Sequence, residues 1–379
     1  MFESWLLSSY NQFKQSLSLN HAANSIIIAG DPTLGISKLV LKMASLYLCS
    51  DKRENEQCGK CKSCLLFNED EHPTHPDLLF LLPRGSVLKE KTEDTESSAV
   101  DTVTHSIEDF INDSDYELNN LDTFQTGGIR QIRVEDVKNF CDWIMQGSVL
   151  ANGKVAVISN AHLMNESASN ALLKTFEEPP SDTLIILVTK SFDELPATIL
   201  SRAIKMQVNA VSIDEAKSFL KYHYKDEYDD SRAEIALTLA NNSPYKAIAL
   251  YNQELDLKCS SIITLIDDVY SRKKSVNELI ESLESTQEQQ RYRILKEFIL
   301  ELLKYKARIS IDNLPFMKKV NAAALCSISA QVLFRASDAV EDLKPIKTGI
   351  PHRAPNSNER RGLHRFLRRC HRHAAQQRP

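Results

Sequence analysis

The chain of 379 residues lacks both a long hydrophobic run and a targeting signal at its start. A membrane-spanning helix needs about 20 consecutive, mainly apolar residues, and no segment of the sequence approaches that length. The first residues, MFESWLLSSYNQF, lack the basic stretch followed by an apolar stretch that marks a secretory signal. We therefore expect a cytoplasmic protein with no membrane partner.

Charge is unevenly distributed, although the net charge is only −5. Residues 86–123 carry eleven Asp or Glu against two Lys, and residues 352–379 carry eight Arg and four His against one Glu. Because a charged run of low hydrophobicity cannot bury enough surface to fold, we expect residues 86–123 to form a solvated insertion. We expect the basic tail, residues 344–379, to be disordered. It either neutralises nucleic-acid phosphates or results from a shifted reading frame, which its abrupt change of composition favours.

A degraded phosphate-binding loop lies near the N-terminus. The segment GDPTLGIS matches the pattern G-x-x-x-x-G-K-[ST] at Gly30, Gly35 and Ser37, but Ile36 stands where the lysine belongs. A strand-like run over 25–29 precedes it and a helical run over 38–48 follows, as the motif requires. The loop N–H groups could still face a phosphate, but the cation that reaches the β- and γ-phosphates is missing. We therefore expect a nucleotide-hydrolase scaffold that does not hydrolyse.

Four of the eight cysteines lie close together: Cys49, Cys58, Cys61 and Cys64. Their C-x8-C-x2-C-x2-C spacing favours a tetrahedral zinc site rather than a disulfide scaffold. An iron–sulfur cluster is an alternative, because C-x2-C-x2-C also occurs in ferredoxin-type sites. His72 and His75 are reserve ligands, although their HPTHPD segment is more typical of an extended turn. Cys49 could instead be a small buried hydrophobe on its helix.

The pattern of apolar residues divides the chain. Uncharged apolar runs with helical segments between them predict parallel strands covered by helices, near 25–29, 77–82, 154–158 and 184–188. A 3.6-residue period predicts a helix over 134–146, and Asn165 caps another over 165–178. Capping-box patterns at Ser212 and Ser275 open helices in a region without strand signals. We expect an α/β nucleotide-binding domain over 1–209, a small helical unit over 210–250 and a helical domain over 251–343.

A second phosphate-chemistry motif is also degraded. After the strand KVAVI, a hydrolase would present Asp and Glu to hold Mg²⁺ and polarise water, but here Ser159 and Asn160 follow. We expect this pair only to form hydrogen bonds at the strand end. The loss of the lysine together with these acids is hard to reconcile with an ATPase.

Four signals occur together in this chain: the lysine-less loop, the CGKCKSC cluster after its helix, NALLKTFEEPP at 170–180, and LPATILSR at 195–202. The combination resembles the delta-prime family of subunits of bacterial DNA polymerase III clamp loaders over residues 1–250, with general helical agreement to 343. The resemblance implies an α/β AAA+ fold, a parallel sheet with flanking helices, followed by a helical lid and an all-α collar domain. It also implies a zinc module over 49–64.

The resemblance assigns roles to several residues of this chain. It implies that ATP is neither bound nor hydrolysed here, and that Arg202 serves the ATP of a neighbouring subunit as an arginine finger. Ser201 and Arg202 match the family's Ser-Arg-Cys motif, with Ala203 in place of the cysteine. A guanidinium supplied in trans offers two donors to a γ-phosphate, and the alternative is an ordinary surface arginine. Tyr245 replaces a sensor arginine of the lid, and Thr189 either matches the first sensor position or only ends a strand.

The implied partners are the gamma/tau and delta subunits and, through the complex, the sliding clamp and primed DNA. The chain would support ATP-driven clamp loading in DNA replication without activity of its own, as part of the DNA polymerase holoenzyme, a nucleotidyltransferase complex. Two other functions are alternatives to this one. An active gamma/tau-type ATPase is disfavoured by Ile36 and by the pair Ser159 and Asn160, and a zinc-dependent nucleic-acid-binding protein is disfavoured by the acidity of the folded part.

Overall fold

The computed structural model describes residues 3–18, 24–53, 56–67, 73–84, 103–114 and 130–341. The chain divides into two compact units between Ala210 and Val211. The first unit combines a sheet with helices, and the described part of the second contains helices only. None of the helices in the described ranges is long and apolar enough to span a bilayer. The predicted basic tail, 344–379, lies outside the described residues.

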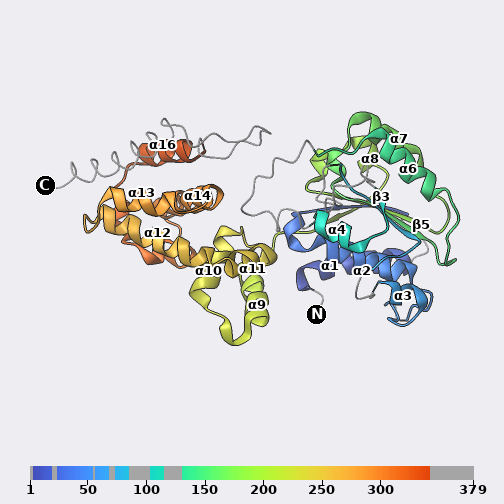
Figure 1. The fold of residues 1–379 in the computed structure, drawn as a ribbon, viewed down its shortest axis with the longest axis horizontal. Helices are drawn as coiled ribbons and strands as arrows, with labels where there is room; N and C mark the ends of the chain where they lie inside the picture. The colour runs from blue at the N-terminus through green and yellow to red at the C-terminus, as the bar shows by residue number, and fades with distance from the viewer. Residues whose placement is uncertain are drawn as a thin grey trace, which may run out of the picture. The chain divides into compact units, whose positions relative to one another are not determined.

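The first unit is built on a six-stranded sheet with the order β3-β2-β4-β5-β1-β6 (Figure 1). All neighbouring strands are parallel except β3, which runs antiparallel to β2. Every residue of β1, β2, β4 and β5 is buried, as expected for strands covered on both faces. The strands are β1 (Ser25–Ala29), β2 (Leu78–Leu81), β3 (Val103–Thr104), β4 (Lys154–Ile158), β5 (Thr183–Thr189) and β6 (Ile204–Gln207).

The four predicted strands correspond to β1, β2, β4 and β5, and the predicted fold class is confirmed. Sequence reasoning missed β3 and β6, which are the short strands at the two edges of the sheet. Residues of β3 are only partly buried, and β6 exposes half of its residues, so neither shows the continuous apolar run of an inner strand.

Helices cover both faces of this sheet. Figure 1 shows α1 (Ser4–Ser18) and α2 (Ile36–Leu48) on one side, and α6 (Val134–Ile144), α7 (Glu166–Glu177) and α8 (Ala197–Leu200) on the other. The apolar side chains of α6 and α7 pack with those of the inner strands in one core cluster. Asn165 caps α7 as predicted, because its side chain accepts a hydrogen bond from Ala168 N at 2.8 Å. A short helix, α3 (Lys62–Leu66), follows α2.

The prediction that residues 86–123 form a solvated insertion is wrong for 103–114. These residues form β3 and the helix α4 (Ile107–Ser114). Ile107 and Phe110 are buried, and the Phe110 ring stacks on that of Phe80 with centroids 4.4 Å apart. The acidic composition of the whole segment conceals the apolar side chains that bury one face of α4. The rest of the predicted insertion lies outside the described residues.

The second unit is helical throughout its described part. The predicted caps at its helix starts are present: Ser212 accepts a hydrogen bond from Glu215 N, and Ser275 and Glu278 form a capping box. Arg232 and Asp256 join α10 to α12 by two hydrogen bonds of 2.6 and 3.2 Å. Its main helices are α9 (Ile213–Tyr224), α10 (Asp230–Leu239), α11 (Pro244–Asn252), α12 (Leu255–Tyr270), α13 (Val276–Glu284), α14 (Glu288–Lys306), α15 (Ala322–Leu325) and α16 (Ala330–Glu341).

Candidate functional site

The degraded phosphate loop closes on itself. Between β1 and α2 it forms a single 3₁₀ turn, η1 (Pro32–Leu34). The N–H and hydroxyl of Thr33 both donate to Asp31 Oδ1, at 2.9 and 2.6 Å, and Leu34 N donates to Asp31 O at 3.0 Å. Gly35 N donates to Pro32 O at 3.3 Å, and Pro32 has no N–H. A phosphate site needs N–H groups that point at the ligand, but those of Thr33, Leu34 and Gly35 donate to the loop's own acceptors.

Ile36 packs into the protein at the start of α2. Its side chain is buried, and its Cδ1 lies 3.1 Å from the position that a Cβ on Gly30 would occupy. Val208 lies at 3.0 Å from the same position, so a side chain at Gly30 would crowd Val208 and Ile36. Gly35 keeps the left-handed conformation, with φ of 80°, and Ser37 is buried. The predicted loop residues therefore lie together, with an aliphatic side chain in place of a phosphate-binding cation.

The start of the chain contacts this loop and the first turn of α2. The indole N–H of Trp5 donates to Leu34 O at 2.9 Å. Lys38, in the first turn of α2, pairs with the buried carboxylate of Glu3 at 3.1 Å. These contacts join segments about 30 residues apart, and no motif in the sequence indicated them. The contact of Trp5 is with the loop itself, and that of Glu3 is with the helix that follows it.

An acidic side chain reaches the end of β4 from the insertion. Ser159 Oγ and Asn160 Nδ2 donate to Asp113 Oδ2, at 2.7 and 3.1 Å, and the other oxygen of Asp113 pairs with Arg130 Nη2. Asp113 is buried. Ser159 and Asn160 thus form hydrogen bonds at the strand end as expected. Sequence reasoning missed Asp113 and Arg130, because both lie in segments with no recognisable motif.

The two predicted sensor positions make structural contacts. Thr189 ends β5, where its hydroxyl donates to Ser191 O at 3.1 Å and lies 3.4 Å from Glu194 Oε2. Tyr245 lies in the first turn of α11, and its ring meets that of Phe219 edge-on with centroids 5.5 Å apart. Tyr245 thus packs against a neighbouring ring and, unlike the arginine it replaces, has no guanidinium that could contact a nucleotide.

Arg202 lies in the turn after α8 and has several partners there. Its Nε lies 3.1 Å from Glu177 Oε2, at the end of α7. Its Nη1 donates to Thr198 O at 2.7 Å and approaches Ser201 Oγ at 3.4 Å. The side chain remains 33% exposed. The two predicted residues Ser201 and Arg202 are therefore in contact at the surface of the first unit.

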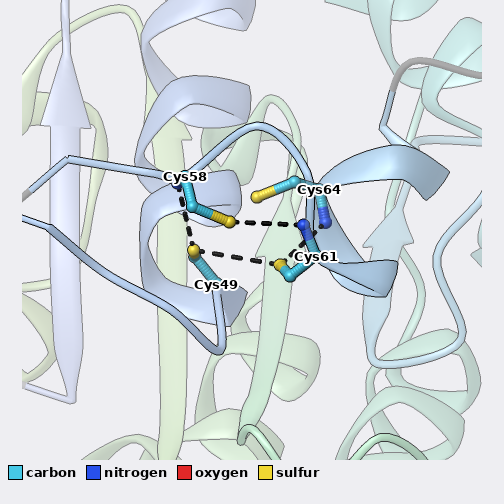
Figure 2. Close-up of side chains that lie close together, drawn as sticks. All are labelled: Cys49, Cys58, Cys61 and Cys64. Atoms are coloured by element: carbon cyan, nitrogen blue, oxygen red, sulfur yellow. Dashed lines mark hydrogen bonds between the residues drawn. The ribbon is translucent and has the colours of Figure 1, made fainter.

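The four clustered cysteines converge on one point, between the end of α2 and the start of α3 (Figure 2). All four sulfur atoms lie within 4.8 Å of one another, and those of Cys49 and Cys61 are 3.9 Å apart. Tetrahedral zinc with bonds of about 2.3 Å would place its sulfur ligands about 3.8 Å apart. This geometry fits a four-coordinate metal ion.

Backbone N–H groups point at the sulfur atoms of this cluster. Cys58 N donates to Cys49 Sγ at 3.3 Å, Cys61 N to Cys58 Sγ at 3.3 Å, and Cys64 N to Cys61 Sγ at 3.4 Å. Burial opposes ionisation of Cys61, but hydrogen bonds from Ser50 and from Cys64 N lower the pKa of its thiol to about 5. Burial raises the pKa of the Cys49 and Cys64 thiols, so the N–H donors favour the thiolate at Cys61 in particular. Such donors stabilise thiolates, which are the form that binds a metal.

His75 is not a fifth candidate ligand. Its Nδ1 accepts a hydrogen bond from Asp77 N at 3.1 Å, and its Nε2 lies 2.9 Å from Ser63 Oγ. Since a backbone N–H can only donate, the proton of the neutral ring lies on Nε2 and points to Ser63. Burial lowers the pKa of His75 to about 4, which keeps the ring neutral. His72 lies outside the described residues.

Comparisons with known proteins return one family model and several curated relatives. The family described as "DNA polymerase III, delta subunit" matches residues 7–212. "DNA polymerase III subunit delta'" of Pseudomonas aeruginosa is 24% identical over 69% of this chain and 66% of its own length. The protein of the same description from Escherichia coli is 25% identical over 65% of this chain and 60% of its own length. The chain thus matches less than two thirds of these two relatives.

Other matches are shorter or more distant. "DNA polymerase III subunit gamma" of Buchnera aphidicola is 33% identical, but over only 27% of this chain and 28% of that protein. A solved gamma-subunit-related protein of Thermotoga maritima covers 92% of this chain and 94% of its own, at 14% identity and a TM-score of 0.39. The family match spans more than half of the chain. The protein therefore belongs to the DNA polymerase III delta-subunit family, and within it to the delta-prime type.

Proposed function

We propose that this chain is a non-hydrolysing subunit of a DNA polymerase III clamp loader. It would support the ATP-driven loading of a sliding clamp onto primed DNA, with gamma/tau and delta subunits as its partners. The relatives' descriptions place them in DNA polymerase III. The observation that carries the non-hydrolysing role is the phosphate loop itself, in which Ile36 replaces the lysine and the N–H groups of Thr33, Leu34 and Gly35 donate to Asp31 and Pro32.

Electrostatics at the loop oppose nucleotide binding. A phosphate entering here would meet the Asp31 carboxylate at the start of the 3₁₀ turn and would find no lysine at position 36. The like charges repel, and the cation that would stabilise phosphoryl transfer is absent. Opening the loop would also break the contact between Trp5 and Leu34.

The end of β4 is also unsuited to hold Mg²⁺. Asp113 is the acid in contact with Ser159 and Asn160, and its charge is already paired with the guanidinium of Arg130. A divalent cation at this carboxylate would have to displace Arg130 or sit beside its positive charge. The metal that phosphoryl transfer requires has no open carboxylate here among the described residues.

Arg202 is suited to act on a partner's nucleotide rather than on one of its own. It is partly exposed, its guanidinium carries five N–H donors in a fixed fork, and the Thr33, Leu34 and Gly35 N–H groups of its own chain's loop donate within that loop. We infer that it serves as an arginine finger for the ATP of a neighbouring subunit, with Ser201 beside it. Such a group in trans accelerates phosphoryl transfer by about 10³-fold or more in other systems.

The cysteine cluster supports the proposal of one structural zinc ion. Cys49, Cys58, Cys61 and Cys64 would supply four thiolates and leave no position open for water or substrate. A closed site of this kind contributes folding free energy and does no chemistry. The bound ion would join the end of α2 to the start of α3.

The second candidate function is that of an active gamma/tau-type ATPase, which the match to gamma subunits favours. The two candidates differ in the fate of ATP on the isolated chain. A gamma-type motor hydrolyses it at its own loop, whereas the proposed subunit acts only through Arg202 in the complex. Hydrolysis of ATP by the isolated chain would therefore support the gamma-type motor, and no hydrolysis would support the proposed subunit.

The test is a clamp loader reconstituted with Arg202→Ala and measured for ATPase rate in the presence of clamp and primed DNA. We expect a loss of about tenfold or more if the finger serves a rate-limiting site, with unchanged assembly because a surface ion pair contributes little stability. Lys205→Ala, which removes an exposed cation from β6, is the matched control and should keep the wild-type rate. A loader with Arg202→Ala that matches the control would refute the finger role.

A further inference from the structure

One acidic residue holds Arg202 in place. Glu177 is the last residue of α7, and its Oε2 lies 3.1 Å from Arg202 Nε. An acid at a helix C-terminus faces the negative end of the helix dipole and is disfavoured there. The arginine opposite compensates for that placement. The pair therefore joins the end of α7 to the turn that follows α8.

Two further contacts also restrain the Arg202 side chain. Its Nη1 donates to Thr198 O at 2.7 Å and lies 3.4 Å from Ser201 Oγ, so the pair is part of a local network. An arginine side chain has five N–H donors in a fixed fork. Glu177, Thr198 and Ser201 engage Nε and Nη1, and no contact of Nη2 is found among the described residues. The guanidinium is thus held on one side while Nη2 stays available to an acceptor.

We propose that Glu177 is a positioning residue for Arg202. This inference rests on the proposed arginine-finger function and adds the group that orients it. A flexible arginine must lose rotamer freedom when it binds a phosphate, and a side chain that is already held loses less. Orientation of a catalytic group before binding lowers the barrier in the same way. Glu177 would act through Arg202 and would not touch the nucleotide.

The experiment uses Glu177→Ala, Glu177→Gln and the control Glu178→Ala in the reconstituted, clamp- and DNA-stimulated loader. Glu178 is the adjacent exposed acid, so its removal changes the net charge equally. We expect Glu177→Ala to lower the ATPase rate about two- to fivefold, the range that loss of an exposed ion pair allows. Glu177→Gln should lose less, since its amide oxygen can still accept the Nε–H bond, and Glu178→Ala should match the wild type.

A second readout follows Arg202 directly in the isolated full-length chain. The ¹⁵Nε–¹H resonance of Arg202 should shift, and its proton should exchange faster with water, in Glu177→Ala but not in Glu178→Ala. If Glu177→Ala leaves both the resonance and the loader's ATPase rate unchanged while Arg202→Ala lowers that rate, the positioning role is refuted and the finger role stands. If Arg202→Ala also has no effect on the rate, the finger role itself fails and the positioning role falls with it.

Discussion

Ser159 at the end of β4 donates a hydrogen bond of 2.7 Å to Asp113, a residue of the helix α4 in the acidic insertion. The carboxylate is buried and also pairs with Arg130. A segment whose composition predicts solvation therefore places a charged group against the centre of the sheet. It occupies the point where a hydrolase of this class would hold its metal.

The pairing of Asp113 with Arg130 should be essential for the stability of the first unit. Arg130→Ala would leave a buried carboxylate without its counter-charge, and we expect a loss of about 3–5 kcal/mol in the free energy of unfolding. Urea denaturation of the full chain measures it. Asp109→Asn, on the same helix but only partly buried, is the control and should cost less than about 1 kcal/mol. If the Arg130→Ala protein were as stable as this control, the Asp113 carboxylate would not need Arg130 as its counter-charge.

Restoring the missing lysine should not restore nucleotide binding. In Ile36→Lys the N–H groups of Thr33, Leu34 and Gly35 would still donate to Asp31 and Pro32, and the acids that should follow β4 would still be absent. Titration with a fluorescent ATP analogue and Mg²⁺ should show no saturable binding to the wild type or to this variant. A gamma-type subunit with an intact loop serves as the positive control. Micromolar binding by Ile36→Lys would mean that the closed loop opens readily.

The purified chain should contain about one zinc ion, as expected for a single four-thiolate site. Cys49→Ser removes one of the four sulfur atoms and should lower both the zinc content and the melting temperature. Cys141→Ser is the matched control, because Cys141 lies outside the cluster. Elemental analysis and thermal unfolding measure the two effects. Iron with a visible absorption band would instead support the iron–sulfur alternative, and full zinc content in Cys49→Ser would exclude Cys49 as a ligand.

Stability of the second unit should fall as pH rises from about 4.5 towards 7. Glu301 is buried, and burial raises the pKa of its carboxyl from 4.5 to about 7, against the hydrogen bonds from Phe316 N and Met317 N. The folded state therefore holds this proton more tightly than the unfolded chain. The stabilisation that the protonated Glu301 carboxyl gives to the folded state is complete below pH 4.5 and is lost as pH passes 7.

Glu301→Gln should remove this pH dependence. The amide oxygen can still accept from Phe316 N and Met317 N without carrying a buried charge. We expect a gain of about 1–3 kcal/mol over the wild type at pH 8 and little change at pH 5. Thermal unfolding at both pH values measures it, with Glu281→Gln on the exposed face of α13 as the control. An equal effect at both pH values would show that Glu301 is ionised throughout.

The sequence by itself determined the features that local patterns encode. Continuous apolar runs predicted the four inner strands, the spacing of cysteines predicted their convergence, and Asn165, Ser212 and Ser275 marked helix starts. The missing lysine at position 36 was also visible without a structure. Each of these signals depends on residues that are close in the chain, where backbone geometry fixes the relation between them.

Only the tertiary structure decided which distant groups meet. The contacts of Trp5 with the phosphate loop, of Asp113 with Ser159 and of Glu177 with Arg202 each join residues 25 to 46 positions apart. An isolated charged or aromatic residue carries no periodicity and no motif that would name its partner. Its role depends on how the sheet and helices pack, because packing brings the side chains within hydrogen-bonding distance and removes the water between them.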